Sequence, residues 1–254
     1  MGNMAETIIA ANWKMHKTIG QSIEFARSLK DALSKKPVSA AIVIAPPFTS
    51  LGALKLELKD SAVLLAGQNM NAVPQGAMTG EISGEMLLDA GCKYCILGHS
   101  ERRLHFGEDD RLINAKVIAA LECGLKPVFC IGEKLAEREA AATLQVISRQ
   151  LKEGLNKVSA GDIKKIVIAY EPVWAIGTGK TATPQQAQEV HLFIRKFLNE
   201  IYGEKEVAGV SLIYGGSVNA ENIDSLMAQT EISGVLVGSA SLDLASFLRI
   251  INFQ

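Results

Sequence analysis

A short apolar run recurs eight times along the chain, and a longer amphipathic stretch follows most of these runs. The runs are rich in valine, isoleucine, leucine or aromatic residues and are apolar at successive positions rather than at alternate ones. That pattern is typical of parallel strands that are covered by helices. The runs span residues 7–13, 40–45, 62–67, 93–98, 126–132, 165–170, 210–215 and 234–238.

The segments between the runs indicate helices. Residues 22–33 and 184–202 carry apolar residues at helical spacing, and Pro184 follows Thr183, a suitable N-cap. Two folds alternate strands and helices in this way, a (β/α)₈ barrel of about 250 residues and an open doubly wound sheet. The open sheet usually has a glycine-rich turn after its first strand, whereas residues 12–14 here read NWK. We therefore predict a (β/α)₈ barrel, an α/β fold of eight parallel strands surrounded by helices.

Length and charge limit the classes of function. We expect one barrel domain over residues 1–254 and interpret Met1–Asn3 as an expression remnant or a disordered end ahead of Met4. A net charge of -1 gives no field that would attract nucleic acid or an anionic membrane. No apolar run approaches the ~18 residues of a membrane helix, and the N-terminus lacks the pattern of a signal peptide. We expect a cytoplasmic protein without nucleic-acid or membrane partners.

The four cysteines allow two interpretations. Cys92 and Cys95 form a C-x-x-C pair with His99 downstream, which weakly suggests a metal or redox site. However, Cys95 lies inside a strand-like run, and no second ligand pair has zinc spacing. We favour buried free thiols, including Cys123 and Cys130, and predict no metal site.

Polar residues and glycines follow several of the predicted strands. Catalytic groups of a barrel lie at the carboxyl ends of its strands, so these positions form the candidate site. They are Asn12 and Lys14 after the first run, His99 and Glu101 after the fourth, Glu171 after the sixth, Gly216 and Ser217 after the seventh, and Gly238 and Ser239 after the eighth.

Glu171 is the candidate base. It directly follows an apolar run and precedes Pro172, which stiffens the turn out of the strand. Apolar neighbours would remove water from the carboxylate and make it a stronger base. A carboxylate in a salt bridge at the barrel rim is the alternative.

His99 is the candidate electrophile. A helix-like segment follows it, with Ser100 as a possible N-cap. A helix N-terminus disfavours imidazolium, so we expect a neutral ring that donates a hydrogen bond, with a structural histidine as the alternative. His16, His105 and His191 lack such a position, and we interpret them as structural.

Lys14 would place a cation at the same carboxyl-terminal end of the barrel, where it could bind an anion, stabilise an enolate or form a Schiff base. A solvated lysine is the alternative.

Gly216-Ser217 and Gly238-Ser239 each precede a helix-like segment. Backbone N–H groups at two neighbouring helix starts can bind an anion, and phosphate sites of barrels lie after strands seven and eight. Tight turns without a ligand are the alternative.

The segment YEPVWAIGTGK, residues 170–180, ends like a nucleotide-binding P-loop. A P-loop would need glycine at Trp174, and a G-x-S-x-G motif would need glycine at Arg102 or Asn219, so both motifs fail. An apolar segment with small residues just after a candidate base instead favours a lid that closes over substrate. The predicted lid residues are Pro172, Val173, Trp174, Ala175, Ile176, Gly177, Thr178, Gly179 and Lys180.

Together these segments are similar to the triosephosphate isomerase family over essentially the whole chain from Glu6 onward. AANWKMH, GHSERR, YEPVWAIGTGK, YGGSV and GVLVGSASL resemble the family's signatures in their order and approximate spacing. Each segment alone is weak evidence, but the set is specific. The family is itself a standard example of a glutamate base beside a neutral histidine, so the roles above agree with a known case.

The resemblance implies an isomerase that needs neither metal nor cofactor and that interconverts dihydroxyacetone phosphate and D-glyceraldehyde 3-phosphate through an enediolate. Glu171 would move a proton between C1 and C2, and His99 would polarise the carbonyl. Lys14, with Asn12 beside it, would stabilise the enediolate and the phosphate, and Glu101 would support them. Backbone amides would bind the phosphate at Gly177, Ser217, Gly238 and Ser239.

The resemblance also implies a homodimer. Residues 68–83 are similar to a family loop that inserts into the neighbouring subunit, which would place Met15 and Thr79 at the interface. The chain departs from the family at two positions. Ser239 replaces a more usual glycine but retains its backbone N–H, and Met78 replaces a more usual phenylalanine.

Two other classes of function remain as alternatives. A Schiff-base aldolase would use Lys14 as its nucleophile and would give Glu171 no role. A non-catalytic phosphosugar-binding or purely structural barrel would show no turnover. The joint presence of a base, an electrophile, a cation, phosphate-binding amides and a lid favours the isomerase.

Overall fold

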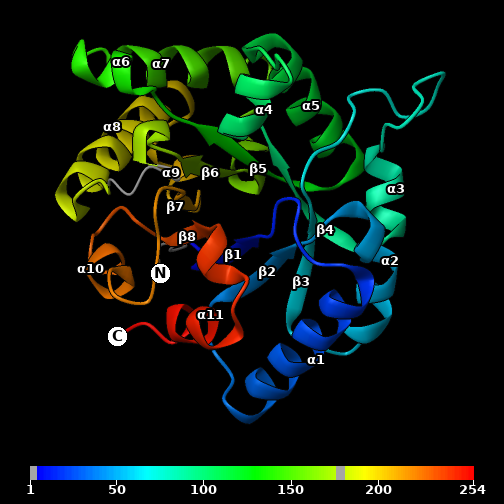
Figure 1. Cartoon of the computed structure of the whole chain (residues 1–254). Helices are drawn as coiled ribbons and strands as arrows, with labels where there is room; N and C mark the ends of the chain where they lie inside the picture. Colours follow the sequence, from blue (N-terminus) through cyan, green and yellow to red (C-terminus); the bar gives the residue numbers. More distant parts are fainter. Residues whose placement is uncertain (1–4, 176–180) are drawn as a thin grey trace.

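The computed structural model describes residues 5–175 and 181–254. Within them, eight parallel strands pair in chain order, and the last strand pairs with the first to close a barrel (Figure 1). The predicted (β/α)₈ barrel is confirmed. The strands are β1 (Ile8–Asn12), β2 (Ala41–Ala45), β3 (Val63–Gly67), β4 (Cys92–Leu97), β5 (Lys126–Ile131), β6 (Val167–Tyr170), β7 (Leu212–Tyr214) and β8 (Gly234–Val237).

Helices connect the strands and surround the barrel (Figure 1). The predicted start of the long helix after the lid is confirmed, because Thr183 caps it by accepting a hydrogen bond from the N–H of Gln186, and Pro184 is its first residue. The helices are α1 (Ile19–Lys35), α2 (Phe48–Glu57), α3 (Gly84–Asp89), α4 (Ser100–His105), α5 (Asp110–Cys123), α6 (Leu135–Glu139), α7 (Thr143–Gly154), α8 (Pro184–Tyr202), α9 (Glu204–Val207), α10 (Ile223–Met227) and α11 (Leu244–Ile251), with short 3₁₀ turns η1 (Ile163–Lys165), η2 (Val173–Ala175) and η3 (Ser239–Ser241).

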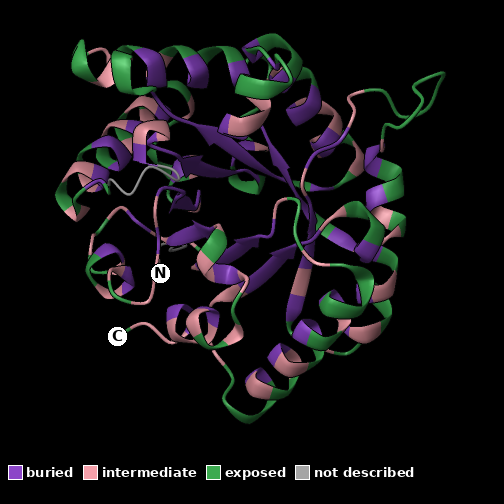
Figure 2. Ribbon diagram, viewed as in Figure 1, coloured by how far each residue is buried: buried purple, intermediate pink, exposed green. Residues whose placement is uncertain are grey.

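The strands are apolar at every position because each of their faces meets a different part of the core. In β1, Ile8 and Ala10 belong to the cluster that fills the barrel interior. Ile9 and Ala11 belong to the larger cluster between the strands and the helices. Figure 2 shows the result, with buried strands inside helices that are buried only on their inner faces. The barrel is therefore a packed scaffold, and only its ends can hold a ligand.

The cysteines are free, and Cys92, Cys95 and Cys130 are buried while Cys123 is half-buried. Burial raises the pKa of Cys92 to about 12, which keeps this thiol protonated. The interpretation as free thiols, mostly buried, is confirmed. In the described part of the chain, no group of three or more His, Cys, Asp and Glu side chains is arranged to hold a metal ion. None of the described helices combines the length and the apolar character needed to cross a bilayer.

Candidate active site

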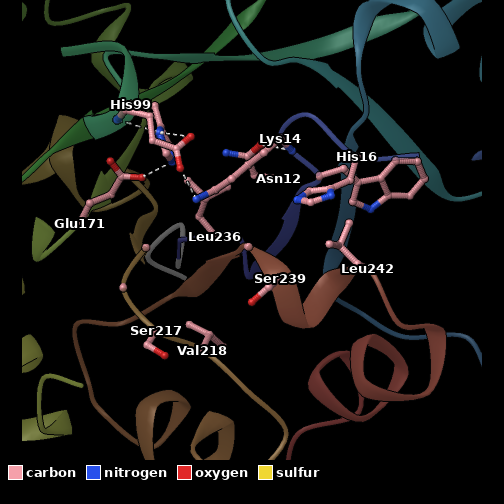
Figure 3. A pocket seen from close by; sticks show the side chains of 15 residues that line it. Asn12, Lys14, His16, His99, Glu171, Ser217, Val218, Leu236, Ser239 and Leu242 are labelled. Atoms are coloured by element: carbon pink, nitrogen blue, oxygen red, sulfur yellow. Dashed lines mark hydrogen bonds and ion pairs between the residues drawn. The ribbon is translucent and has the colours of Figure 1, made fainter. Parts of the chain in front are cut away.

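A cavity of about 320 Å³ lies at the carboxyl ends of the strands, and it gathers nearly all of the predicted site residues (Figure 3). Gly177 and the other lid residues from Ile176 to Lys180 lie outside the described residues, as does Met1–Asn3. The cavity is lined by Asn12, Lys14, His99, Glu101, Glu171, Gly216, Ser217, Gly238 and Ser239, and also by Trp13, His16, Gly215, Val218, Leu236 and Leu242.

Glu171 is held at the end of β6 with only 1% of its surface exposed. Its backbone N–H donates to the carbonyl of Ile131 at 2.7 Å, so the hydrogen bonding of the barrel continues past the strand. One carboxylate oxygen, Oε2, accepts a hydrogen bond from the N–H of Ser100 at 3.0 Å. The other, Oε1, is buried and accepts no hydrogen bond from any described residue. One oxygen is therefore anchored by a backbone N–H, and the other lies next to the ring of His99.

His99 is buried beside this carboxylate, with its Nε2 3.0 Å from Oε1 of Glu171. The ring N–H is not aligned for a hydrogen bond to that oxygen, which has no hydrogen-bond donor among the described residues. On the other side of the ring, Nδ1 accepts a hydrogen bond from the N–H of Glu101 at 3.3 Å. The prediction of Ser100 as N-cap is wrong, because His99 is the N-cap of α4 and Ser100 is its first helical residue. The N–H of Ser100 instead donates its hydrogen bond to Oε2 of Glu171.

Lys14 projects into the cavity from the loop after β1 (Figure 3). Its backbone N–H donates to Oδ1 of Asn12 at 3.0 Å, and Gln68 donates to its carbonyl at 2.8 Å. Its ammonium lies 2.5 Å from Oε1 of Glu101. Burial opposes ionisation of Glu101, but the hydrogen bond from Lys14 and its charge outweigh this effect and lower the pKa of that carboxyl. The cation and the carboxylate therefore hold each other in place.

The opposite wall of the cavity includes the loops after β7 and β8, which contribute Ser217, Gly238 and Ser239. The 3₁₀ turn η3 begins at Ser239, directly after Gly238, as predicted for a helix start. A helix also follows Ser217, but α10 begins only at Ile223, five residues into the predicted helix-like segment 218–227. Asn222 causes the difference, since its amide donates to the carbonyl of Ser217 at 2.9 Å and keeps this segment in a side-chain-stabilised turn.

The sequence of the whole chain can be compared with those of known proteins. The family model described as triosephosphate isomerase matches residues 7–254. The chain belongs to the triosephosphate isomerase family. It is therefore an isomerase, and the resemblance seen in the sequence is confirmed. Among its relatives, the triosephosphate isomerase of Syntrophotalea carbinolica is 50% identical over 251 residues, which cover 99% of both chains. That of Moorella thermoacetica is 49% identical over 99% of this chain and all of the relative, and that of Carboxydothermus hydrogenoformans is 50% identical over 98% and 99%.

In this isomerase the first part of the predicted lid is anchored by a residue that the sequence analysis missed. Glu133 is fully buried, and its carboxylate accepts hydrogen bonds from the hydroxyl of Tyr170 at 3.1 Å and the indole N–H of Trp174 at 2.8 Å. Its carbonyl accepts from the N–H of Val173 at 3.0 Å. Burial first, and then the charge of Glu133, raise the pKa of Tyr170 far above its ordinary value, so this hydroxyl stays a donor. Position provided a usable signal, because Glu133 follows β5 much as Glu171 follows β6.

The other histidines differ in position. His16, which we interpreted as structural, is exposed and lines the cavity (Figure 3). It belongs to the same loop as Lys14, and that proximity in the sequence was the available signal. His191 is fully buried in α8, in agreement with a structural role, and His105 is exposed at the end of α4.

Proposed function

We propose that this isomerase interconverts dihydroxyacetone phosphate and D-glyceraldehyde 3-phosphate, with Glu171 as the base. The observation that carries the proposal is the buried Glu171 carboxylate in a cavity that Lys14 also lines. One of its oxygens is anchored by the N–H of Ser100, and the other lies 3.0 Å from Nε2 of His99. The substrate is suggested by the relatives, which are named triosephosphate isomerases and match over nearly their whole length.

In the proposed reaction, Oε1 of Glu171 takes a proton from C1 of dihydroxyacetone phosphate. The electron pair of that C–H bond forms a C1–C2 double bond, and the carbonyl electrons move to oxygen, which gives an enediolate. The N–H at Nε2 of His99 and the ammonium of Lys14 stabilise the new charge on oxygen, and His99 moves a proton between the two oxygens. Glu171 returns its proton to C2. Atoms and charge balance without any further reactant.

A neutral His99 is supported by the hydrogen bond at its other nitrogen. Because Nδ1 accepts from the N–H of Glu101, that nitrogen carries no proton, and the single ring proton belongs to Nε2. This is the nitrogen nearest to Oε1 of Glu171. A neutral donor is suited to a carbonyl whose oxygen gains and then shares a proton.

The phosphate would bind at the opposite wall, to the backbone N–H groups of Ser217, Gly238 and Ser239, with Lys14 as the nearby cation. A Cβ atom built on Gly238 would lie 3.8 Å from Cε of Lys14, so the cation and this turn are close neighbours. The amide of Gly177 and the closure of the lid over residues 172–180 stay predictions. They would exclude water from an enediolate that can otherwise eliminate phosphate.

Lys14 is poorly suited to the alternative aldolase chemistry. A Schiff base forms from a neutral amine, and enzymes obtain one by desolvation or by a neighbouring cation. The Lys14 ammonium instead lies 2.5 Å from the Glu101 carboxylate, an anion rather than a second cation. This pair supports an electrostatic role in the isomerase.

We also propose that the active form is a homodimer in the cytoplasm, without nucleic-acid partners. Residues 68–83 form a long connection between β3 and α3 that projects from the barrel (Figure 1). Thr79 lies in its exposed part, and Met78 is 50% exposed. Met15, next to Lys14, is 94% exposed. A second chain that covers these apolar side chains would also support the loop that carries Lys14.

The test compares the parent protein with Glu171→Gln in the isomerisation of glyceraldehyde 3-phosphate, coupled to NADH oxidation by glycerol-3-phosphate dehydrogenase. The amide keeps the size of the side chain but cannot accept the proton, so kcat should fall by about 10³-fold or more. Glu153→Gln, at an exposed position of α7, serves as the matched control and should retain full activity. Equal turnover by the parent and Glu171→Gln would refute the mechanism, and a folded but inactive parent would refute the reaction.

A further inference from the structure

Lys17 lies in the loop between β1 and α1 and has an unusual backbone conformation. Its φ is 71°, and Lys14 in the same loop has a φ of 52°. This left-handed region favours glycine and is uncommon for lysine. Residues other than glycine persist there when the surrounding structure holds them in place, and such positions gather at functional sites. The contacts of the Lys17 side chain show what holds this loop.

The Lys17 ammonium makes a contact far along the chain. Its Nζ donates a hydrogen bond to the carbonyl of Leu242 at 2.8 Å. It also lies 4.6 Å from the ring centroid of Phe25 and 5.4 Å from that of Trp13. The two rings are buried and pack edge to face with 5.1 Å between their centroids, so they form a rigid cation–π site for the ammonium. The position of the ammonium is therefore defined by two aromatic faces and one backbone carbonyl.

The accepting carbonyl belongs to the last residue of a tight turn. The N–H of Ser241 donates to the carbonyl of Gly238 at 2.9 Å, and the N–H of Leu242 donates to that of Ser239 at 3.0 Å. The hydroxyl of Ser241 adds a hydrogen bond to Gly238 at 2.6 Å. A lysine at the carboxyl end of such a turn satisfies a free carbonyl and complements its dipole. Because the turn is internally bonded, a shift at Leu242 would reach Gly238 and Ser239.

We propose that Lys17 is a positioning residue that holds the turn of Gly238 and Ser239 against the loop of Lys14. It thereby sets the separation between the catalytic cation and the backbone amides that receive the phosphate. Lys17 does not line the cavity, whereas Leu242 does, so the effect acts through the turn. The inference rests on the proposed function for the identity of the phosphate site.

Burial and the neighbouring charges act in opposite directions on the pKa of Lys17. Burial lowers the pKa of Lys17, while the carboxylates of Asp243 and Glu24 oppose this effect. Asp243 is the N-cap of α11, directly after Leu242, so it adds a second attraction at the same end of the turn.

The experiment measures KM and kcat for glyceraldehyde 3-phosphate, and inhibition by inorganic phosphate, in Lys17→Met, Lys17→Arg and the parent. Methionine keeps the apolar stem but removes the charge and the donor, whereas arginine keeps both. We expect Lys17→Met to raise KM and the phosphate inhibition constant together, by roughly three- to tenfold, with a smaller change in kcat. Lys17→Arg should restore most of the affinity.

Lys55→Met is the matched control, because Lys55 donates a comparable hydrogen bond to the carbonyl of Asp89 at 2.6 Å and does not line the cavity. It should leave KM and phosphate inhibition unchanged. If Lys17→Met binds substrate as tightly as the parent, or if both variants lose the same affinity, the inference is overturned.

Direct titration with inorganic phosphate separates the positioning role of Lys17 from the proposed reaction. Weaker phosphate binding by Lys17→Met with an inactive parent would refute the reaction and retain the positioning role, and a parent that binds no phosphate would overturn both.

Discussion

At the scale of single residues, the site depends on how closely the chain approaches the Glu171 side chain. The N–H of Gly215, after β7, donates to the carbonyl of Tyr170 at 2.7 Å, which brings this loop against the base. A Cβ atom built on Gly215 would lie 2.8 Å from Cγ of Glu171. Gly215 is therefore needed for its lack of a side chain, and its effect on activity can be separated from its effect on stability.

Gly215→Ala should move the Glu171 carboxylate away from its observed position. We expect kcat to fall by about 10²-fold, because displacements of about 1 Å at the reacting groups have effects of that size. Assay of the folded variant by the coupled reaction measures this, with circular dichroism to verify the fold. Gly161→Ala is the control, since a Cβ atom built on Gly161 would meet only Ser159 Oγ, at 3.7 Å. Full activity of Gly215→Ala would show that the carboxylate tolerates the displacement.

At the scale of elements, helix α8 connects the packing of the barrel to the site. His191 on its inner face is fully buried, and its Nδ1 lies 3.1 Å from the carbonyl of Glu231. Its ring meets that of Tyr170 edge to face, with 5.8 Å between centroids. Because Tyr170 precedes Glu171, the helix supports the strand that presents the base. Protonation of this buried ring would disturb that contact.

Burial lowers the pKa of His191 to about 4, which predicts a loss of stability in acid. Between about pH 6.5 and pH 4 the unfolded chain binds a proton at this ring and the folded chain does not. As the pH is lowered through this range, the free energy of unfolding should therefore decrease, by about 3 kcal/mol from this group. Urea unfolding at pH 7.5, 5.5 and 4.5 measures the effect.

His191→Gln removes the titrating group, so its stability should depend less on pH in this range, even if the variant is less stable at pH 7.5. His105→Gln changes an exposed histidine and should follow the parent. Equal losses in the parent and in His191→Gln would show that other groups cause the acid sensitivity.

At the scale of the whole molecule, closure of the barrel brings the ends of distant strands to one mouth and leaves apolar side chains exposed around it. Met15 is the most exposed of these large apolar residues, and Phe106, just after α4, is 66% exposed. Met15 directly follows Lys14, and Phe106 follows α4, the helix that His99 caps. A second subunit that covers this region would connect assembly to catalysis.

Met15→Lys should therefore separate the proposed dimer, since a buried unpaired ammonium at an interface is strongly unfavourable. Sedimentation velocity should show the parent at twice its chain mass of 27.2 kDa and the variant at the mass of one chain. Activity should fall with dissociation because the Lys14 loop loses its support. Leu56→Lys, at a position of α2 that is 75% exposed, should stay dimeric. A monomeric parent would refute the assembly.

Local sequence patterns were sufficient for the elements of the barrel and for most of the site. Apolar runs with two buried faces predicted the strands, and positions at or just after the strand ends identified Asn12, Lys14, His99 and Glu171. Thr183 was also recognisable as an N-cap. These features follow from residue type and near neighbours in the chain, because helix capping and strand burial depend on spacings of only a few residues.

Contacts between distant segments required the tertiary structure. The sequence predicts that Ser100 caps a helix, but its N–H anchors Glu171, which lies 71 residues away, and His99 caps the helix instead. Lys17 meets Leu242 across 225 residues, and Glu133 reaches Trp174 across 41. No local pattern encodes such pairs, because they form only when the closed barrel brings the carboxyl ends of its strands together. The sequence by itself determined the barrel and the kinds of chemical group at its mouth, and the packing of that barrel decided which atoms of those groups meet.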